Sequence, residues 1–162
     1  MNQRKILVSM EPRQGAYVAF ADLDSVLADQ RGDLERLLGR ASSLYSESVS
    51  ALSQMVSERN TLRVQRRPVP ARLVWRIGRA VWALQEVLGE IGLELDGVYD
   101  HLSRDIGVKR KSLEKAVIFG RYIPHESAIP ESLRWGKCEH GTRQIALQIC
   151  RGSIEDSRDD QG

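Results

Sequence analysis

The 162-residue sequence is poor in aromatic residues and in cysteine. Phenylalanine, tryptophan and tyrosine together make up 6% of the chain, and there are two cysteines. Strands are enriched in aromatic and β-branched residues, and small secreted domains are rich in disulfides. Since leucine, arginine and serine are prominent instead, the composition favours an all-α fold, with Cys138 and Cys150 as reduced core residues.

Long apolar runs are also missing. No run is long enough to cross a bilayer, and the first ten residues hold too short an apolar stretch for a secretory signal. We therefore expect a cytoplasmic protein with no membrane partner.

Motifs for phosphate, dinucleotide or acyl-enzyme chemistry are absent, because the sequence contains no G-x-x-x-x-G-K-[ST], G-x-G-x-x-G or G-x-S-x-G. Cys138 and His140 lack the paired spacing of a zinc site. Asp22 and Asp24 lie at an expected helix start, where carboxylates act as caps. We expect no enzyme, no cofactor and no metal. A small metal-dependent nuclease that uses these aspartates and a histidine stands as a minor hypothesis.

Helical periodicity dominates what is present. Residues 1–15 are expected to form a strand-like or irregular arm, and from Tyr17 apolar residues recur at spacings of three and four. A break near Gly32 separates two expected helices, the second over about 33–63, because glycine is unfavourable in a helix interior. Residues 1–67 thus form a helical arm or hairpin.

The second of these helices has two interpretations. One is a weak coiled coil that serves dimerisation or partner docking, and the other is an amphipathic helix packed on its own domain. The heptad seam of the coiled coil would contain Leu34, Leu37, Ala41, Leu44, Ser48, Ala51, Met55 and Leu62.

Pro68 and Pro70 interrupt the helical pattern, because proline lacks the backbone donor and pushes the preceding residue to extended geometry. We place a domain boundary here. A small helical domain is expected over residues 71–150, beginning with a helix that ends near Gly92, and an acidic flexible tail over 151–162.

The stretch from Leu102 to Val117, LSRDIGVKRKSLEKAV, has the pattern of two short helices joined by a glycine turn. With Asp96 as the N-cap, the first helix ends at Gly107 and the second begins near Arg110. The inward positions are Val98, Leu102 and Ile106, then Leu113, Ala116 and Val117. This is the pattern of a helix-turn-helix, whose second helix enters the DNA major groove, although a generic αα-hairpin fits most of it.

The net charge of +2 is uninformative, but basic residues gather on the second helix. Cations near a helix N-terminus are disfavoured by roughly 0.3 to 1 kcal/mol, and a bound phosphate would remove that conflict. In the predicted DNA-binding site, four residues approach base edges and three meet phosphates. The first group is Arg110, Lys111, Ser112 and Lys115, and the second is Arg104, Lys109 and Arg121.

A second basic region lies between Arg59 and Arg79, where seven arginines occur without an acidic residue. These arginines either extend the nucleic-acid surface or keep the linker soluble.

Three segments carry a resemblance to a known family: LVWRIGRAV at 73–81, HLSRDIGVKRKSLEKAVIFGRYIP at 101–124 and SLRWGKCEHGTRQIA at 132–146. They resemble the N-terminal helical domain of a large bacterial family of PD-(D/E)xK-superfamily nucleases. The matching positions are Trp75, Ile77, Gly78, Leu102, Ser103, Phe119, Tyr122 and Trp135.

In that family a separate C-terminal domain carries the metal-binding carboxylates and lysine, whereas only a short tail follows Cys150 here. The resemblance implies a non-catalytic DNA-binding module that serves a nuclease, a mobile-element system or a regulator, as a homodimer or in a larger complex. The alternative is a protein-interaction subunit that docks through its helical arm onto a larger nucleoprotein complex.

Overall fold

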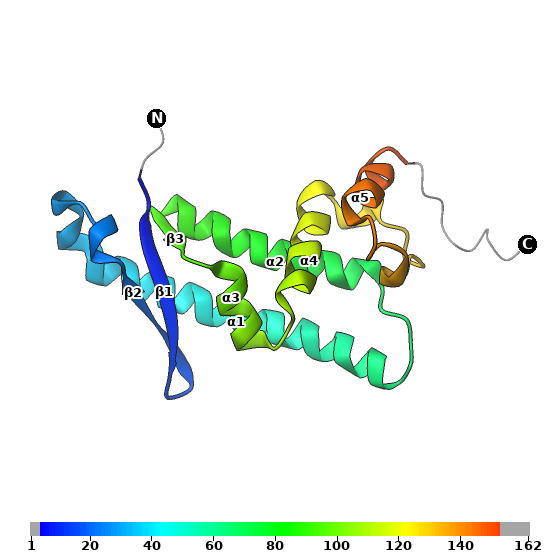
Figure 1. Ribbon diagram of the computed structural model, residues 1–162, viewed down its shortest axis with the longest axis horizontal. Helices are drawn as coiled ribbons and strands as arrows, with labels where there is room; N and C mark the ends of the chain where they lie inside the picture. The colour runs from blue at the N-terminus through cyan, green and yellow to red at the C-terminus, as the bar shows by residue number, and fades with distance from the viewer. Residues whose placement is uncertain (1–3, 153–162) are drawn as a thin grey trace, which may run out of the picture.

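The computed structural model describes residues 4–152 (Figure 1). Two of its connections contain short 3-10 helices, at Leu23–Ser25 and Ala28–Asp33 in the first and at Glu126–Ala128 and Trp135–Lys137 in the second. In chain order the strands and helices are β1 (Ile6–Arg13), β2 (Ala16–Ala21), α1 (Leu34–Val64), α2 (Ala71–Glu90), β3 (Leu93–Leu95), α3 (Val98–Ile106), α4 (Arg110–Tyr122) and α5 (Thr142–Cys150).

The expectation of an all-α fold is wrong, because a three-stranded mixed sheet with the order β2-β1-β3 packs beside the helices. β1 is antiparallel to β2 and parallel to β3. Along β1, Ile6, Val8 and Met10 are buried while the residues between them are half-buried. This alternation is the period of a strand with one face on the core. The expected strand-like start of the chain is thereby confirmed.

The helix expected from Tyr17 is also wrong, because Ala16–Ala21 is β2. The turn before it places Gln14 and Gly15 at φ 50° and 81°, which closes a hairpin onto β1. The leucines at 23 and 27, which contributed to the helical spacing, are exposed at 72% and 45%. They therefore belong to no core face.

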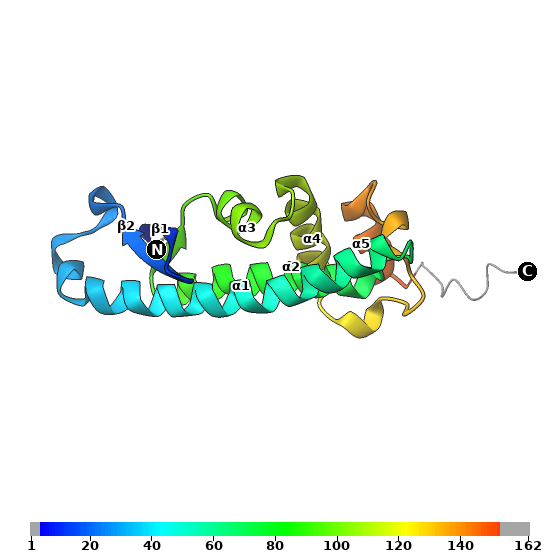
Figure 2. The same ribbon diagram turned by 90° about the horizontal axis from the view of Figure 1, so that it is seen from below.

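α1 and α2 form a long antiparallel pair, and the sheet, α3 and α4 lie over it as a second layer (Figures 1 and 2). α1 packs on its own protein, and a coiled coil is not supported, because Ala41 of the heptad seam is buried in this core and four further seam residues are half-buried against it: Leu34, Leu37, Leu44 and Met55. The buried residues of α1 are Ala41, Tyr45, Val49, Leu52 and Val56. From the serine-rich middle of α1, the Ser42 hydroxyl accepts a hydrogen bond of 2.9 Å from the Ala19 N–H and so covers part of the edge strand.

The prolines end the α1 segment as predicted, and α2 starts at Ala71. A single apolar cluster joins the residues before the prolines to those after them, since β1 pairs with β3 and α1 packs on α2. Of the expected acidic tail, Arg151 and Gly152 form a turn, and residues 153–162 lie outside the described part. No helix within residues 4–152 is long and apolar enough to span a membrane.

The two cysteines are free thiols. Cys138 is buried, as expected, and its burial raises the pKa of the thiol to about 11. Cys150 is exposed on α5, contrary to its expected place in the core, and its thiol donates a hydrogen bond of 3.1 Å to the Tyr122 carbonyl.

Candidate nucleic-acid interface

The α3–α4 unit has the predicted corner. α3 ends at Gly107, which adopts a left-handed conformation with φ 69° and donates its N–H to the Ser103 carbonyl over 3.1 Å. α4 begins at Arg110. The six inward positions predicted for the two helices are all buried. The predicted N-cap is wrong: Gly97 precedes α3, and the Asp96 N–H is bonded to the Val8 carbonyl over 2.9 Å, as a continuation of the sheet.

Two glycines bring the backbones of α2 and α4 into direct contact. A Cβ on Gly78 would lie 1.8 Å from the Ala116 carbonyl oxygen, and a Cβ on Gly120 would lie 2.7 Å from the Arg79 nitrogen. Only glycine permits so close an approach.

Aromatic side chains surround this crossing. The Trp75 indole donates to the Ile123 carbonyl over 2.9 Å, and the Phe119 and Trp135 rings meet edge to face at 5.3 Å. Four of the eight positions that carry the family resemblance therefore hold α4 in place: Trp75, Gly78, Phe119 and Trp135.

The basic end of α4 lies next to the corner. Lys109 and Lys111 are exposed and Lys115 is half-buried. None of the three forms an ion pair within residues 4–152. The N-cap residue Lys109 provides no side-chain hydrogen bond, and the first turn of α4 has no acidic residue. Ser112 is half-buried beside the lysines. This end of the helix therefore combines backbone donors without a side-chain cap and unpaired positive charge.

Arg110 is engaged by carboxylates of the protein. Its Nε lies 3.1 Å from Glu114 Oε1, and its Nη1 lies 3.1 Å from Asp100 Oδ1. The hydrogen bond to Glu114 and the charge of Asp100 raise the pKa of the Arg110 guanidinium. Because Asp100 belongs to α3, the arginine links the two helices of the unit.

Arg104 is a structural residue. Its Nη2 donates to the Met10 carbonyl over 2.8 Å, and its Nε lies 2.7 Å from Asp105 Oδ1. Asp105 is also the acceptor for the Tyr45 hydroxyl of α1. Arg104 thus ties α3 to β1 and to the Tyr45–Asp105 pair.

Arg121 stands apart from the basic end, near the C-terminus of α4. It borders a hollow of about 640 Å³ that Lys5, Trp82 and Glu94 also line. Of the seven predicted residues, the structure therefore groups Lys109, Lys111, Ser112 and Lys115 at the corner and gives Arg104 and Arg110 internal partners.

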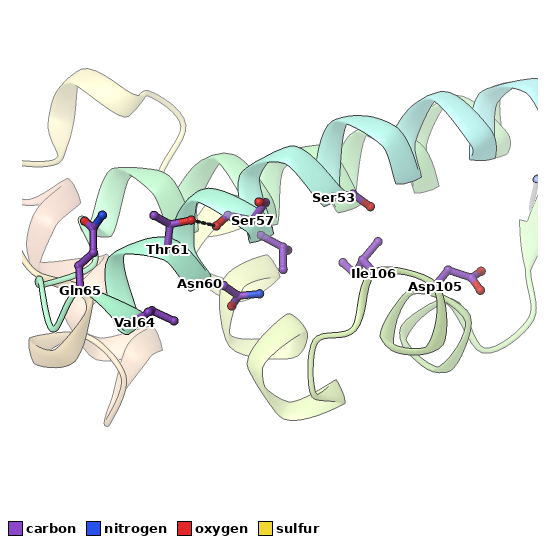
Figure 3. A pocket seen from close by; sticks show the side chains of 9 residues that line it. Ser53, Ser57, Asn60, Thr61, Val64, Gln65, Asp105 and Ile106 are labelled. Atoms are coloured by element: carbon purple, nitrogen blue, oxygen red, sulfur yellow. Dashed lines mark hydrogen bonds between the residues drawn. The ribbon is translucent and has the colours of Figure 1, made fainter.

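A groove between α1 and α3 had no counterpart in the sequence analysis (Figure 3). It encloses about 440 Å³. α3 contributes Asp105 and Ile106, and one face of α1 contributes Ser53, Val56, Ser57, Asn60, Thr61, Val64 and Gln65. The one sequence signal for it is Val64 among polar residues at the helix end, where it is 84% exposed.

The arginines between residues 59 and 79 divide into two sets. Those of α2 have internal partners: Arg72 donates to the Ile129 carbonyl over 2.8 Å, Arg76 pairs with Glu126, and Arg79 lies against the Trp75 and Trp82 rings. Those at the end of α1 form no ion pair within residues 4–152; they are Arg59, Arg63, Arg66 and Arg67.

Residues 4–152 contain no group of three or more histidine, cysteine or acidic side chains placed to hold a metal ion. Asp22 acts as a cap, as predicted, and accepts the Asp24 N–H over 3.1 Å.

Comparison of the chain with protein-family models, with curated proteins and with solved structures finds no match.

Proposed function

We propose that this chain is a non-catalytic DNA-binding protein that places α4 in the major groove of a duplex. One observation carries the proposal. Directly after the Gly107 corner, Lys109 and Lys111 lie at a helix N-terminus that has no side-chain cap, and Lys115 follows one turn further on. None of these lysines forms an ion pair within residues 4–152. A polyanion would satisfy both the charge and the free backbone donors of this end.

In this proposal the roles within the site differ from residue to residue. Lys109 and the first backbone N–H groups of α4 meet phosphates, while Lys111, Ser112 and Lys115 face the groove. Arg110 keeps α4 in position against Asp100, and Arg104 acts only through the fold. Arg121 meets phosphates at the far end of the helix.

The test is the salt dependence of binding to a duplex, measured by fluorescence anisotropy. For Lys111→Gln with Lys115→Gln, we expect weaker binding and a smaller preference for one duplex sequence over another, since both lysines face base edges. For Lys109→Gln, which loses a phosphate contact, the slope of log Kobs against log salt should be smaller by about 0.9. The matched control is Arg31→Gln with Arg40→Gln, which removes the same charge from exposed positions far along the chain. Equal binding by both double variants and the parent would contradict the proposal.

The wider setting follows from the family resemblance. We propose a cytoplasmic bacterial protein that supplies DNA recognition to a nuclease, a mobile-element system or a regulator. Four of the eight residues that carry the resemblance lie at the α2–α4 crossing, which supports a shared way of holding α4.

A second candidate function is favoured by the groove between α1 and α3. In this alternative the chain is an interaction subunit of a larger nucleoprotein complex, and α1 docks a partner protein through the exposed Val64, at a groove that Val56 and Ile106 also line. Light scattering and DNA binding distinguish the two. A chain that binds DNA alone, as a monomer or a homodimer, favours the first, whereas a monomer with no DNA affinity until a partner is added favours the second.

A further inference from the structure

The C-terminal end of α1 carries a cluster of arginines around a cleft that is separate from the α4 surface. The cleft encloses about 270 Å³ and is lined by Arg63, Arg134 and Glu139, with Pro68, Val69, Trp135 and Gly136 as the remaining walls. In Figure 1 this end of α1, the loop into α2 and α5 lie at the same end of the molecule.

The two walls of the cleft are held together by backbone hydrogen bonds. The Trp135 N–H donates to the Val69 carbonyl over 2.8 Å, and the Ala71 N–H donates to the Leu133 carbonyl over 2.9 Å. Arg134 lies between these two hydrogen bonds, and its backbone pairs with that of Pro70 in an isolated antiparallel β-bridge. Its backbone is therefore fixed relative to the start of α2.

Arg59 adds an unmet polar group to this cluster. Its Nε is buried and has no hydrogen-bond partner, although its terminal nitrogen lies 3.4 Å from the Asn60 side chain. Burial, together with the charge of Arg63 one turn further on, lowers the pKa of Arg59, and Glu139 only partly offsets this. Arg63 and Arg134 thus line the cleft with a single carboxylate, that of Glu139, and Arg59 stands one turn before Arg63. None of the three arginines forms an ion pair within residues 4–152.

A further arginine, Arg66, follows the end of α1 and has a backbone conformation that favours glycine. Arg66 has φ 57°, and the Arg67 N–H reaches back to the Leu62 carbonyl over 2.8 Å, which is the hydrogen bonding of a Schellman motif. A left-handed conformation is unfavourable for a residue with a side chain.

We infer that this cleft binds a phosphate group through Arg63 and Arg134, with Arg59 adding positive charge from one turn before Arg63. Guanidinium groups match the geometry of phosphate oxygens and bind them by paired, charge-assisted hydrogen bonds. A dianion would accept hydrogen bonds from Arg63 and Arg134 and neutralise the excess positive charge around the cleft. The phosphate belongs either to a nucleic-acid backbone or to a free phosphate compound. The inference does not depend on the role proposed for α4.

The experiment follows the Nε–Hε signals of the arginines by ¹⁵N NMR while inorganic phosphate replaces chloride at constant ionic strength. We expect saturable shifts of the Arg59 and Arg63 signals in the parent protein. In Arg63→Gln with Arg134→Gln, the phosphate concentration that half-saturates the shift of the Arg59 signal should be at least about tenfold higher than in the parent, since two charge-assisted hydrogen bonds are lost. Arg31→Gln with Arg40→Gln should behave as the parent does, and thermal unfolding midpoints confirm that each variant is folded.

A second arm titrates the same samples with a short DNA duplex. Two results together assign the phosphate to the nucleic-acid backbone. The duplex shifts these signals in the parent, and the slope of log Kobs against log salt is smaller by about two in Arg63→Gln with Arg134→Gln. Shifts with inorganic phosphate alone assign it to a free compound. The site is refuted if neither ligand moves the Arg59 and Arg63 signals saturably. Because Lys111→Gln with Lys115→Gln leaves the cleft intact, its phosphate response separates a failure of the α4 proposal from a failure of this one.

Discussion

At the scale of single residues, the Tyr45 hydroxyl, the Asp105 carboxylate and the Arg104 guanidinium form the main buried polar contact between the two layers. Tyr45 is fully buried, and the side chain of Asp105 is 4% exposed. Burial and the hydrogen bond to Asp105 raise the pKa of Tyr45 well above its usual value. A buried carboxylate is stable only when its acceptors are satisfied, so each partner supports the others.

Removal of the Tyr45 hydroxyl tests this contact. We expect Tyr45→Phe to lower the free energy of unfolding by about 1 to 3 kcal/mol, because Asp105 loses a donor that water does not replace. Tyr17→Phe is the matched control, since the half-buried Tyr17 ring contacts Tyr45 edge to face at 5.0 Å. Urea unfolding followed by circular dichroism measures both. A loss no larger for Tyr45→Phe than for Tyr17→Phe would contradict the assignment.

The same cluster predicts how stability depends on pH. Burial alone would raise the pKa of Asp105, but the hydrogen bonds from Arg104 and Tyr45 outweigh it and hold the pKa below its ordinary value. The carboxylate therefore stabilises the fold fully above about pH 5, and this contribution is lost as the pH falls below about 4 toward the folded-state pKa. The unfolding free energy should fall more steeply with acid in the parent than in Asp105→Asn. Parallel pH profiles for the two proteins would disprove this.

At the scale of secondary-structure elements, the crossing of α2 and α4 decides where the basic surface stands. Because Gly78 and Gly120 let the two backbones touch, the position of α4 is set by main-chain contact and not by the fit of long side chains.

A methyl group at this crossing should be strongly destabilising. For Gly78→Ala we expect a loss of about 3 kcal/mol in the free energy of unfolding, since the new Cβ would overlap the Ala116 carbonyl and force the helices apart. Gly39→Ala in α1 is the control. Nothing lies within 4 Å of its Cβ position, so the higher helix propensity of alanine should stabilise the protein by up to about 1 kcal/mol. Thermal or chemical denaturation of the two variants measures the contrast, which would be absent if α2 and α4 were free to separate.

The sequence predicts the helices better than it predicts the sheet, for reasons that lie in the elements themselves. α1, α2, α3 and α4 each repeat the 3.6-residue period over enough turns to define a face, and glycine or proline marks several of their ends. β1 alternates over only eight residues, and β3 is three residues long. The pairing of β1 with β3 joins residues more than eighty positions apart, which no local pattern reveals.

The candidate site was predictable to a similar extent. Lys109, Lys111 and Lys115 stand at the corner where the charge pattern placed them. The partners of Arg104 and Arg110 were not predictable, because Met10 is 94 residues from the first and Asp100 lies on a different helix from the second. A basic residue is identified from sequence, but its freedom to bind a ligand depends on tertiary contacts.

At the scale of the whole molecule, the helical pair and the sheet share one apolar cluster, although the sequence suggested a boundary at the prolines. β1 and α1, from the first part of the chain, pack on β3 and α2 from the second. Structure on both sides of the boundary therefore depends on the same buried residues.

We accordingly expect residues 4–152 to unfold in one cooperative transition. All three tryptophans, Trp75, Trp82 and Trp135, lie after the prolines, so their fluorescence reports on that part, whereas far-ultraviolet circular dichroism also reports on α1. The two probes should give the same midpoint and slope in urea. Two separate transitions would show instead that residues 1–67 and 71–150 are independent folding units.

The main-chain contact between α2 and α4 also bears on engineering. Since the scaffold holds α4 through Gly120 and the buried residues of the helix, the exposed Lys109 and Lys111 can be exchanged without repacking the interior. A library randomised at these two positions would thus vary the charge and shape of this end of α4 on an unchanged framework.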